Sequence, residues 1–205
     1  MNDQEAHKAV VAAYPQSGKA LERYVDLLAS EGISRGLIGP REGDRLWTRH
    51  IANSVGLAPL LGQGEDVADI GSGAGLPGIP LALVRPDLRL ALVEPLLRRS
   101  VFLAEAIEHL GLGDRVRVIR ARAEDVDLAA DTVTARAVAS LAKLIGWTRP
   151  IWRGGRLLAL KGQSAESEVV AAEGLLTRHG LSAHVLEVGL GGGLEGTRVI
   201  EVRFA

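Results

Sequence analysis

From residue 65 onward, short apolar runs alternate with helical stretches, and this rhythm constrains the fold more than any other feature of the chain. Five runs are typical of buried strands: DVADI, LRLALVE, VRVIRA, TVTARAV and GRLLALKG. Helical stretches such as RRSVFLAEAIEHLG separate them. The alternation predicts a doubly wound, mostly parallel α/β sheet, whose ligands bind beyond the carboxyl ends of the strands. The last two predicted strands, SAHVLEVGL and TRVIEVRFA, have no helix between them, so we expect an antiparallel hairpin joined by GGGLEG.

Residues 1–64 have a different pattern and predict a helical extension packed on one compact α/β unit, residues 65–205. In KALERYVDLLASEG the apolar residues fall on one helical stripe that ends at Gly32: Leu21, Tyr24, Val25 and Leu28. A polar loop follows, and Asp44 is the expected N-cap of a second helix. The residues expected on the apolar face of that helix are Trp47, Ile51, Val55 and Ala58.

Composition excludes several classes of protein. Hydrophobic residues make up 47% and charged residues 24% of the 205 residues, which is typical of a folded chain rather than a disordered one. No apolar run is long enough to span a bilayer, and the N-terminus is too polar for a signal peptide. We therefore expect a soluble, cytoplasmic protein that acts as a monomer and has no membrane partner. The absence of cysteine removes thiolate chemistry and the usual zinc sites, and no metal site is expected.

The net charge of −1 gives no global basic field for a nucleic acid. However, nine arginines lie between residues 85 and 136, whereas the whole chain has only four lysines. Most of these arginines are expected to be ordinary surface residues. A few are candidates for contact with a polyanion, because arginine binds phosphate and guanine edges bidentately.

The segment GSGAGLPGIP, residues 71–80, directly follows the first predicted strand. Glycines at Gly71, Gly73 and Gly75 let the backbone turn sharply and approach a ligand closely, although a tight turn without a ligand fits the same pattern. Glu94 ends the next strand, 21 residues after Gly73, where an acid can bind both hydroxyls of a ribose. These features fit a nicotinamide cofactor and S-adenosylmethionine alike.

Three further features favour S-adenosylmethionine. Asp69 lies two residues before the first glycine, where a negative charge suits an amino group and a sulfonium better than a pyrophosphate. Glu124, after the third strand, is placed to meet an adenine. No second substrate-binding half, which dinucleotide enzymes usually need, is recognisable. A nicotinamide-dependent oxidoreductase is therefore the weaker alternative, as is an RNA-binding module with an unused loop.

Several longer sequence stretches resemble those of the glucose-inhibited division protein B family, whose members are bacterial small-subunit ribosomal RNA methyltransferases. They are RHIANS (residues 49–54), DIGSGAGLPGIPLALVRP (69–86), VFLAEA, ARAED, ARAVASL (135–141) and LLALKGQ (157–163). The likeness runs from about Leu21 to the end of the chain, and GLPGIPLALVRP is far more specific than the glycines alone.

The resemblance implies a seven-stranded class I methyltransferase fold that moves a methyl group from S-adenosylmethionine to N7 of a guanine. The implied partner is 16S ribosomal RNA or the small-subunit particle; another RNA, a protein or a small molecule is the alternative substrate. The implied cofactor residues, taken with the glycine loop and its acids, are Asp69, Gly71, Gly73, Gly75, Leu76, Glu94, Ala123, Glu124 and Arg136. The implied catalytic residues are Arg136 and His50, and those implied for RNA binding are Arg49, Arg98, Arg122 and Lys161.

This chain departs from the family pattern at three places. Glu94 stands where the family more often has aspartate, which keeps the ribose chemistry. Gly36, Leu37 and Ile38 replace a common Asn-Leu-Thr stretch, and Asn53 replaces a common aspartate.

Methylation at guanine N7 would need little acid–base chemistry, because N7 has a free lone pair and no proton to lose. Alignment of the reacting atoms is the main requirement. His50 is therefore expected to be a buried core histidine or an orienting group rather than a base. For Arg136, a structural ion pair with Asp69 or Glu124 and a substrate contact both remain open. Lys161 is expected to contact a phosphate.

Overall fold

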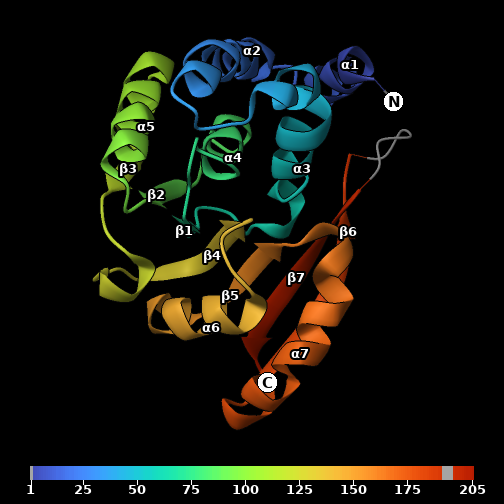
Figure 1. Cartoon of the computed structure of the whole chain (residues 1–205), viewed down its shortest axis with the longest axis vertical. Helices are drawn as coiled ribbons and strands as arrows, with labels where there is room; N and C mark the ends of the chain where they lie inside the picture. The colour runs from blue at the N-terminus through green and yellow to red at the C-terminus, as the bar shows by residue number, and fades with distance from the viewer. Residues whose placement is uncertain (1, 191–195) are drawn as a thin grey trace.

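Seven strands form one sheet in the computed structural model, which describes residues 2–190 and 196–205 (Figure 1). The strands are β1 (Asp66–Ile70), β2 (Arg89–Val93), β3 (Val116–Ile119), β4 (Ala130–Arg136), β5 (Trp152–Leu160), β6 (Leu181–Val188) and β7 (Thr197–Phe204). Their order across the sheet is β3-β2-β1-β4-β5-β7-β6. Strands β1 to β5 are parallel to one another, whereas β7 is antiparallel to both β5 and β6. The predicted mostly parallel sheet with a final antiparallel hairpin is confirmed, although residues 191–195 of the predicted hairpin loop lie outside the described residues.

Helices cover both faces of the sheet. They are α1 (Asp3–Ala13), α2 (Gly18–Leu27), α3 (Ala52–Val55), α4 (Gly78–Val84), α5 (Leu97–Leu110), α6 (Leu141–Thr148) and α7 (Ala165–Arg178). In Figure 1, α2 to α5 lie on one side of the strands, and α6 and α7 lie on the other. Among the described helices, none combines the length and the apolar character needed to cross a membrane.

The alternation of side chains along the strands builds two apolar layers. In β5, Leu158 and Leu160 pack in the layer that holds α4, α5 and the N-terminal helices. Leu157 and Ala159, which point to the opposite face, pack in the layer under α6 and α7. Because both faces are covered, these strands are apolar on both sides and are recognisable as short uninterrupted apolar runs.

The N-terminal helices contain the apolar stripes that the sequence predicts. Leu21, Tyr24 and Leu28 have no solvent exposure, and the stripe continues through a π-helical turn, Leu28–Gly32. Helix α1 has no counterpart among the predicted helices; its start is marked by a capping box, in which Asn2 and Glu5 bind each other's backbone amides.

The predicted N-cap role of Asp44 is wrong. A 3₁₀ helix, Pro40–Arg45, already includes Asp44, and the chain continues as a π-helical stretch, Leu46–Ile51, before α3. The proline at the start of the 3₁₀ helix fixes a helical backbone earlier than the sequence pattern indicates. The predicted apolar face is confirmed, since Trp47, Ile51, Val55 and Ala58 are all buried.

Candidate functional site

The glycine loop lies at the carboxyl end of β1 and has a left-handed backbone at three positions. The φ angles are +67° at Gly71, +59° at Gly73 and +101° at Gly75, which favour glycine. A Cβ at Gly75 would lie 2.4 Å from Ile79 Cδ1, so this position is closed by packing. A Cβ at Gly73 would instead meet no atom nearer than 3.8 Å. The loop therefore leaves an open approach over Gly73, where a bound molecule could reach the backbone.

Asp69 lies beneath the loop and has no solvent exposure. Its Oδ2 accepts from the Gly78 amide at 3.1 Å, and its Oδ1 accepts from the Thr134 hydroxyl at 3.3 Å. Burial raises the pKa of this carboxyl to about 6, while the hydrogen bonds to Gly78, Ser72 and Thr134 lower it. Asp69, expected to face a cofactor, therefore supports the glycine loop through these hydrogen bonds.

Glu94 joins the end of β2 to the same loop. One carboxylate oxygen accepts from the Gly73 amide at 3.0 Å and the other from the Leu96 amide at 3.0 Å, with the Arg99 guanidinium 3.7 Å away. The residue is 1% exposed. Each oxygen of an ionised carboxylate can accept a second hydrogen bond, so the ribose role expected for Glu94 is compatible with these contacts.

Tyr24, on α2, also supports the loop and was not a predicted site residue. Its hydroxyl donates to the carbonyl of Ala74 at 2.8 Å, and the contact is fully buried. Burial raises the pKa of this phenol well above its usual value, so the hydroxyl stays protonated and can donate. The sequence contained only the signal that Tyr24 belongs to an apolar stripe.

The remaining predicted cofactor residues are at the neighbouring strand ends. Leu76 is 9% exposed and packs in the core beside the loop. Ala123 and Glu124 lie on a short 3₁₀ turn, Ala123–Asp125, that follows β3; Ala123 is buried and Glu124 is exposed. Arg122 is exposed as well and lies 3.9 Å from the Glu124 carboxylate.

Arg136 ends β4 and is held by the RHIANS segment rather than by an acid. Its Nη2 lies 2.5 Å from Nδ1 of His50, and its guanidinium also donates to the carbonyls of Arg49 and His50 at 3.3 and 3.5 Å. No ion pair with Asp69 or Glu124 is formed among the described residues, so the structural ion pair considered for Arg136 is absent there. Burial lowers the pKa of Arg136, but guanidinium groups remain charged in proteins.

The backbone turns sharply directly after Arg136. Ala137 has a φ of +53°, the one left-handed non-glycine residue in the described part of the chain. Such strain is retained where surrounding contacts fix it, often at functional sites.

A hollow of about 530 Å³ opens beside this turn. Its lining includes Arg49, Asn53, Arg136, Val138, Lys161 and Glu168. The Lys161 ammonium donates to the Ala139 carbonyl and lies 2.8 Å from the Glu168 carboxylate, and its side chain is only 8% exposed. The structure therefore brings together three predicted residues, Arg49, Arg136 and Lys161. Arg98 is exposed on α5 and is not part of this lining.

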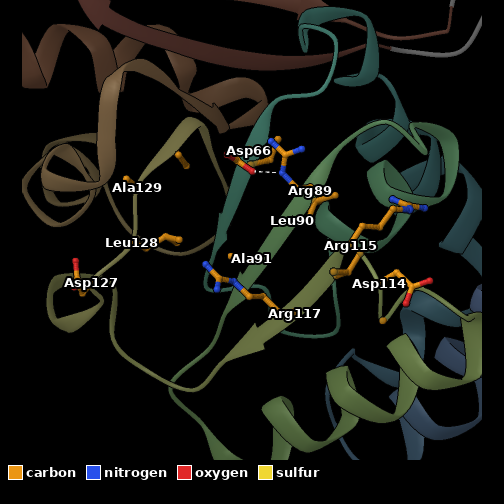
Figure 2. Close-up of a pocket in the computed structure, with 14 residues that line it drawn as sticks. Asp66, Arg89, Leu90, Ala91, Asp114, Arg115, Arg117, Asp127, Leu128 and Ala129 are labelled. Carbon is orange, nitrogen blue, oxygen red and sulfur yellow. Dashed lines mark hydrogen bonds and ion pairs between the residues drawn. The ribbon is translucent and has the colours of Figure 1, made fainter.

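Another hollow, of about 560 Å³, lies at the opposite edge of the sheet (Figure 2). It is bordered by the amino ends of β1 to β3, and Arg89 there pairs with Asp66 at 2.8 Å. Arg117 and Asp114 also line it, but none of the predicted site residues does. Ligands of doubly wound sheets bind at the carboxyl edge, so the site is assigned to the hollow beside Arg136. Within residues 2–190 and 196–205, no group of three acidic or histidine side chains is arranged to hold a metal ion.

Solved structures share this arrangement of strands. A methyltransferase from Aquifex aeolicus, described as dependent on S-adenosylmethionine, superposes with a TM-score of 0.60 at 16% identity, covering 83% of this chain and 96% of that one. The structure described as M. jannaschii TYW2 in complex with AdoMet gives a TM-score of 0.57 at 19% identity, covering 74% of each chain. The fold is that of the class I methyltransferases.

Sequence comparison narrows this class to one family. The model of the rRNA small subunit methyltransferase G family matches residues 17–196. A ribosomal RNA small subunit methyltransferase G from Kineococcus radiotolerans is 52% identical over 200 residues, covering 95% of this chain and 78% of the relative. The protein of the same name from Thermobifida fusca is 55% identical over 185 residues, covering 88% and 78%. The chain belongs to the rRNA small subunit methyltransferase G family and is a methyltransferase.

Proposed function

We propose that this enzyme transfers a methyl group from S-adenosylmethionine to N7 of a guanine in 16S ribosomal RNA. The observation that carries the proposal is the position of the Arg136 hollow, which opens at the same strand ends as the glycine loop in a chain of this family. A cofactor over the loop and an acceptor in the hollow would therefore meet at the end of β4.

The residues around the loop fit the proposed cofactor. Gly71, Gly73, Gly75 and Leu76 would hold its amino acid part, with Asp69 contributing negative charge from beneath. Glu94 retains lone pairs for the ribose hydroxyls. Ala123 and Glu124, on the turn after β3, would contact the adenine. The open side of Gly73 gives the backbone approach that the cofactor needs.

The protein's own contribution to the chemistry is alignment. S-adenosylmethionine, when bound, supplies an electrophilic methyl group, and guanine N7 needs no base to attack it. Arg136 donates to the protein through Nη1 and Nη2, and within the described residues its Nε–H has no acceptor. We assign that donor to the substrate, at O6 or a phosphate rather than at N7, because a bond to N7 would block the attacking lone pair.

The RNA is expected to present an unpaired or flipped-out guanine, since N7 of a stacked base cannot reach a buried methyl group. Arg49, Arg98 and Arg122 are exposed and are proposed to contact phosphates. Lys161 is held by Glu168 and the Ala139 carbonyl, so we propose that it orders the turn after β4 beside the bound RNA.

The proposal is tested by incubating the protein with labelled S-adenosylmethionine and either naked 16S RNA or small-subunit particles, then mapping the labelled nucleotide. Transcripts containing 7-deazaguanosine are the matched control, because they lack only the proposed acceptor atom. We expect label at a single guanine and none in the control RNA. Label retained in the 7-deaza transcript, or no transfer to either form of the RNA, would overturn the assignment.

Cofactor identity has its own test. Calorimetric titration should show binding of S-adenosylmethionine and of its demethylated product but not of NAD. A variant with Gly73→Val should lose this affinity, because the new side chain fills the open approach over the loop. Binding of NAD by the wild-type protein would contradict the choice of cofactor.

A further inference from the structure

Glu42 follows the Gly36-Leu37-Ile38 stretch, which departs from the family pattern, and it contacts two predicted site residues, Arg49 and His50. It is part of the 3₁₀ helix Pro40–Arg45 and is three-quarters buried. Its Oε2 is 3.0 Å from Nε2 of His50, and its Oε1 is 3.4 Å from Nη1 of Arg49. On the other side of the imidazole, Nδ1 faces the guanidinium of Arg136. Three elements thus contribute a row of side chains: Glu42, His50 and Arg136.

The donor and acceptor roles in this row follow from the chemistry of arginine. A guanidinium has only N–H donors, so Nδ1 of His50 must present a lone pair to Arg136. A neutral imidazole that accepts at Nδ1 carries its proton at Nε2. Among the described residues, the carboxylate of Glu42 is the group placed to accept a hydrogen bond from this Nε2–H.

The contact between Glu42 and His50 is close but not fully aligned. Its distance is that of a hydrogen bond, whereas its angle is not, and both Nε2 and Oε2 are buried without another hydrogen-bond partner. Leaving two buried polar atoms without hydrogen bonds destabilises the folded protein. A hydrogen bond between Nε2 of His50 and Oε2 of Glu42 would satisfy both atoms. A small rotation of the ring or of the carboxylate completes the bond.

Burial and the neighbouring charges keep the imidazole of His50 neutral. Burial is the main cause that lowers the pKa of His50 to about 4; Arg136 and Arg49 lower it further, and Glu42 opposes them. Helix α1, which packs against the same segment, contributes two titratable residues. Asp3 accepts from the amides of Trp47 and Thr48, and the His7 ring lies 4.3 Å from the Trp47 ring at a tilt of 42°. His50 therefore remains an acceptor for Arg136 throughout the neutral pH range.

We propose that Glu42 is a positioning residue: it holds His50 with its proton on Nε2, and His50 in turn fixes the guanidinium of Arg136 at the acceptor hollow. The inference rests on the proposed function, which places the guanine beside Arg136. With Nη1 and Nη2 fixed by His50 and the carbonyls of residues 49 and 50, the guanidinium of Arg136, which lines the hollow, is held in one orientation. Glu42 itself touches no reacting atom.

The first experiment measures the tautomer of His50 by long-range ¹H–¹⁵N correlation spectra of the protein without cofactor, assigned by comparison with His50→Gln. We expect the Nε2–H form in the wild-type protein. The variant Glu42→Gln keeps an acceptor oxygen and should keep this form. Glu42→Ala removes the contact that holds the ring against Arg136, so the imidazole can rotate away from the guanidinium and should give a mixture of tautomers. A wild-type His50 with its proton on Nδ1, or an unchanged Nε2–H form in Glu42→Ala, would overturn the proposal.

The second experiment measures single-turnover methylation. A displacement of about 1 Å can lower a rate on the order of a hundredfold, so Glu42→Ala should be slowed at least about tenfold, and Glu42→Gln should recover most of the rate. The matched control is Glu22→Ala, which removes a similar pair, His7 Nε2 to Glu22 at 2.8 Å, on the surface of α1 and α2. It should leave both the His50 spectrum and the rate unchanged.

These readouts separate the two proposals. If the wild-type protein does not methylate 16S RNA while the His50 tautomer responds to Glu42 as expected, the proposed substrate fails and the positioning role stands. If methylation proceeds and Glu42→Ala is as fast as wild type, the positioning role fails alone. Should Glu42→Ala not fold, the spectra of the wild-type protein and of Glu42→Gln decide, because loss of the Nε2–H form in a variant that keeps the acceptor oxygen contradicts the proposal.

Discussion

Asp69 carries a buried charge whose energetic effect can be measured by exchanging it for asparagine. Burial raises its pKa from 3.8 to about 6. One pKa unit corresponds to about 1.4 kcal/mol, so an ionised Asp69 destabilises the folded protein by about 3 kcal/mol at neutral pH. Asparagine has the same shape, keeps an oxygen for the Gly78 amide and removes the charge. The variant Asp69→Asn should therefore be more stable than the wild type near neutral pH.

The sign of the pH dependence follows from proton binding. Between 3.8 and about 6, the folded state binds more protons at Asp69 than the unfolded state, so the stability contributed by this group falls as the pH rises. Relative to wild type, Asp69→Asn should gain about 2 kcal/mol between about pH 4 and about pH 7. The lowered pKa of His50 gives the opposite slope, because its neutral form is favoured by folding, but this slope is shared by both proteins and cancels in their difference.

The assay is urea unfolding followed by circular dichroism at a series of pH values, in the absence of cofactor. Asp66→Asn is the matched control: it makes the same exchange at the exposed start of β1, where the carboxylate pairs with Arg89. It should give no gain in stability at neutral pH, since it removes an ion pair and no buried charge. A difference between Asp69→Asn and wild type that stays constant from about pH 4 to about pH 7 would refute the reasoning.

Three further predictions concern the loop and the acceptor site. Gly75→Ala would place a Cβ 2.4 Å from Ile79 Cδ1 and 3.0 Å from the Tyr24 hydroxyl on a left-handed backbone, so denaturant unfolding should show a loss of about 1–2 kcal/mol for the backbone strain and a further loss for the clash. Gly73→Ala has the same left-handed strain but no clash, so it should lose less stability and should also weaken cofactor binding in calorimetry. Tyr24→Phe leaves the Ala74 carbonyl buried without its donor and should lower the unfolding free energy by about 1–3 kcal/mol, whereas a neutral result would mean that water replaces the hydroxyl. Arg136→Lys should reduce the single-turnover rate far more than the cofactor affinity, because a lysine cannot reproduce the fork of donors; unchanged values for both would remove Arg136 from the site.

The strands were predictable because the sheet is covered on both sides. DVADI coincides with β1, whose last four residues are all buried, and burial on both faces leaves no ambiguity between strand and surface loop. The segment around Asp44 was less predictable. Apolar residues four apart, such as Trp47 and Ile51, suit the π-helical turn found there as well as they suit an α-helix, so the pattern fixed the buried face but not the backbone.

The place of the site was also predictable, because parallel strands bring their carboxyl ends to one edge. That topology alone puts Gly71, Glu94, Arg136 and Lys161 near one another. Their partners were not predictable from spacing. The contact between His50 and Arg136 joins residues 86 apart, and it depends on how the N-terminal segment packs against β4.

The position of β7 makes the pairing of β5 and β6 into one sheet depend on residues 197–204. It is the last strand of the chain, yet it pairs with β5 on one side and with β6 on the other. During synthesis, β5 therefore keeps an open edge, and β6 has no partner in the sheet until residues 197–204 have emerged. Open strand edges are sites of aggregation. A nascent chain stopped before Thr197 would thus present unpaired edges of β5 and β6, so chaperone binding should persist until residues 197–204 are available.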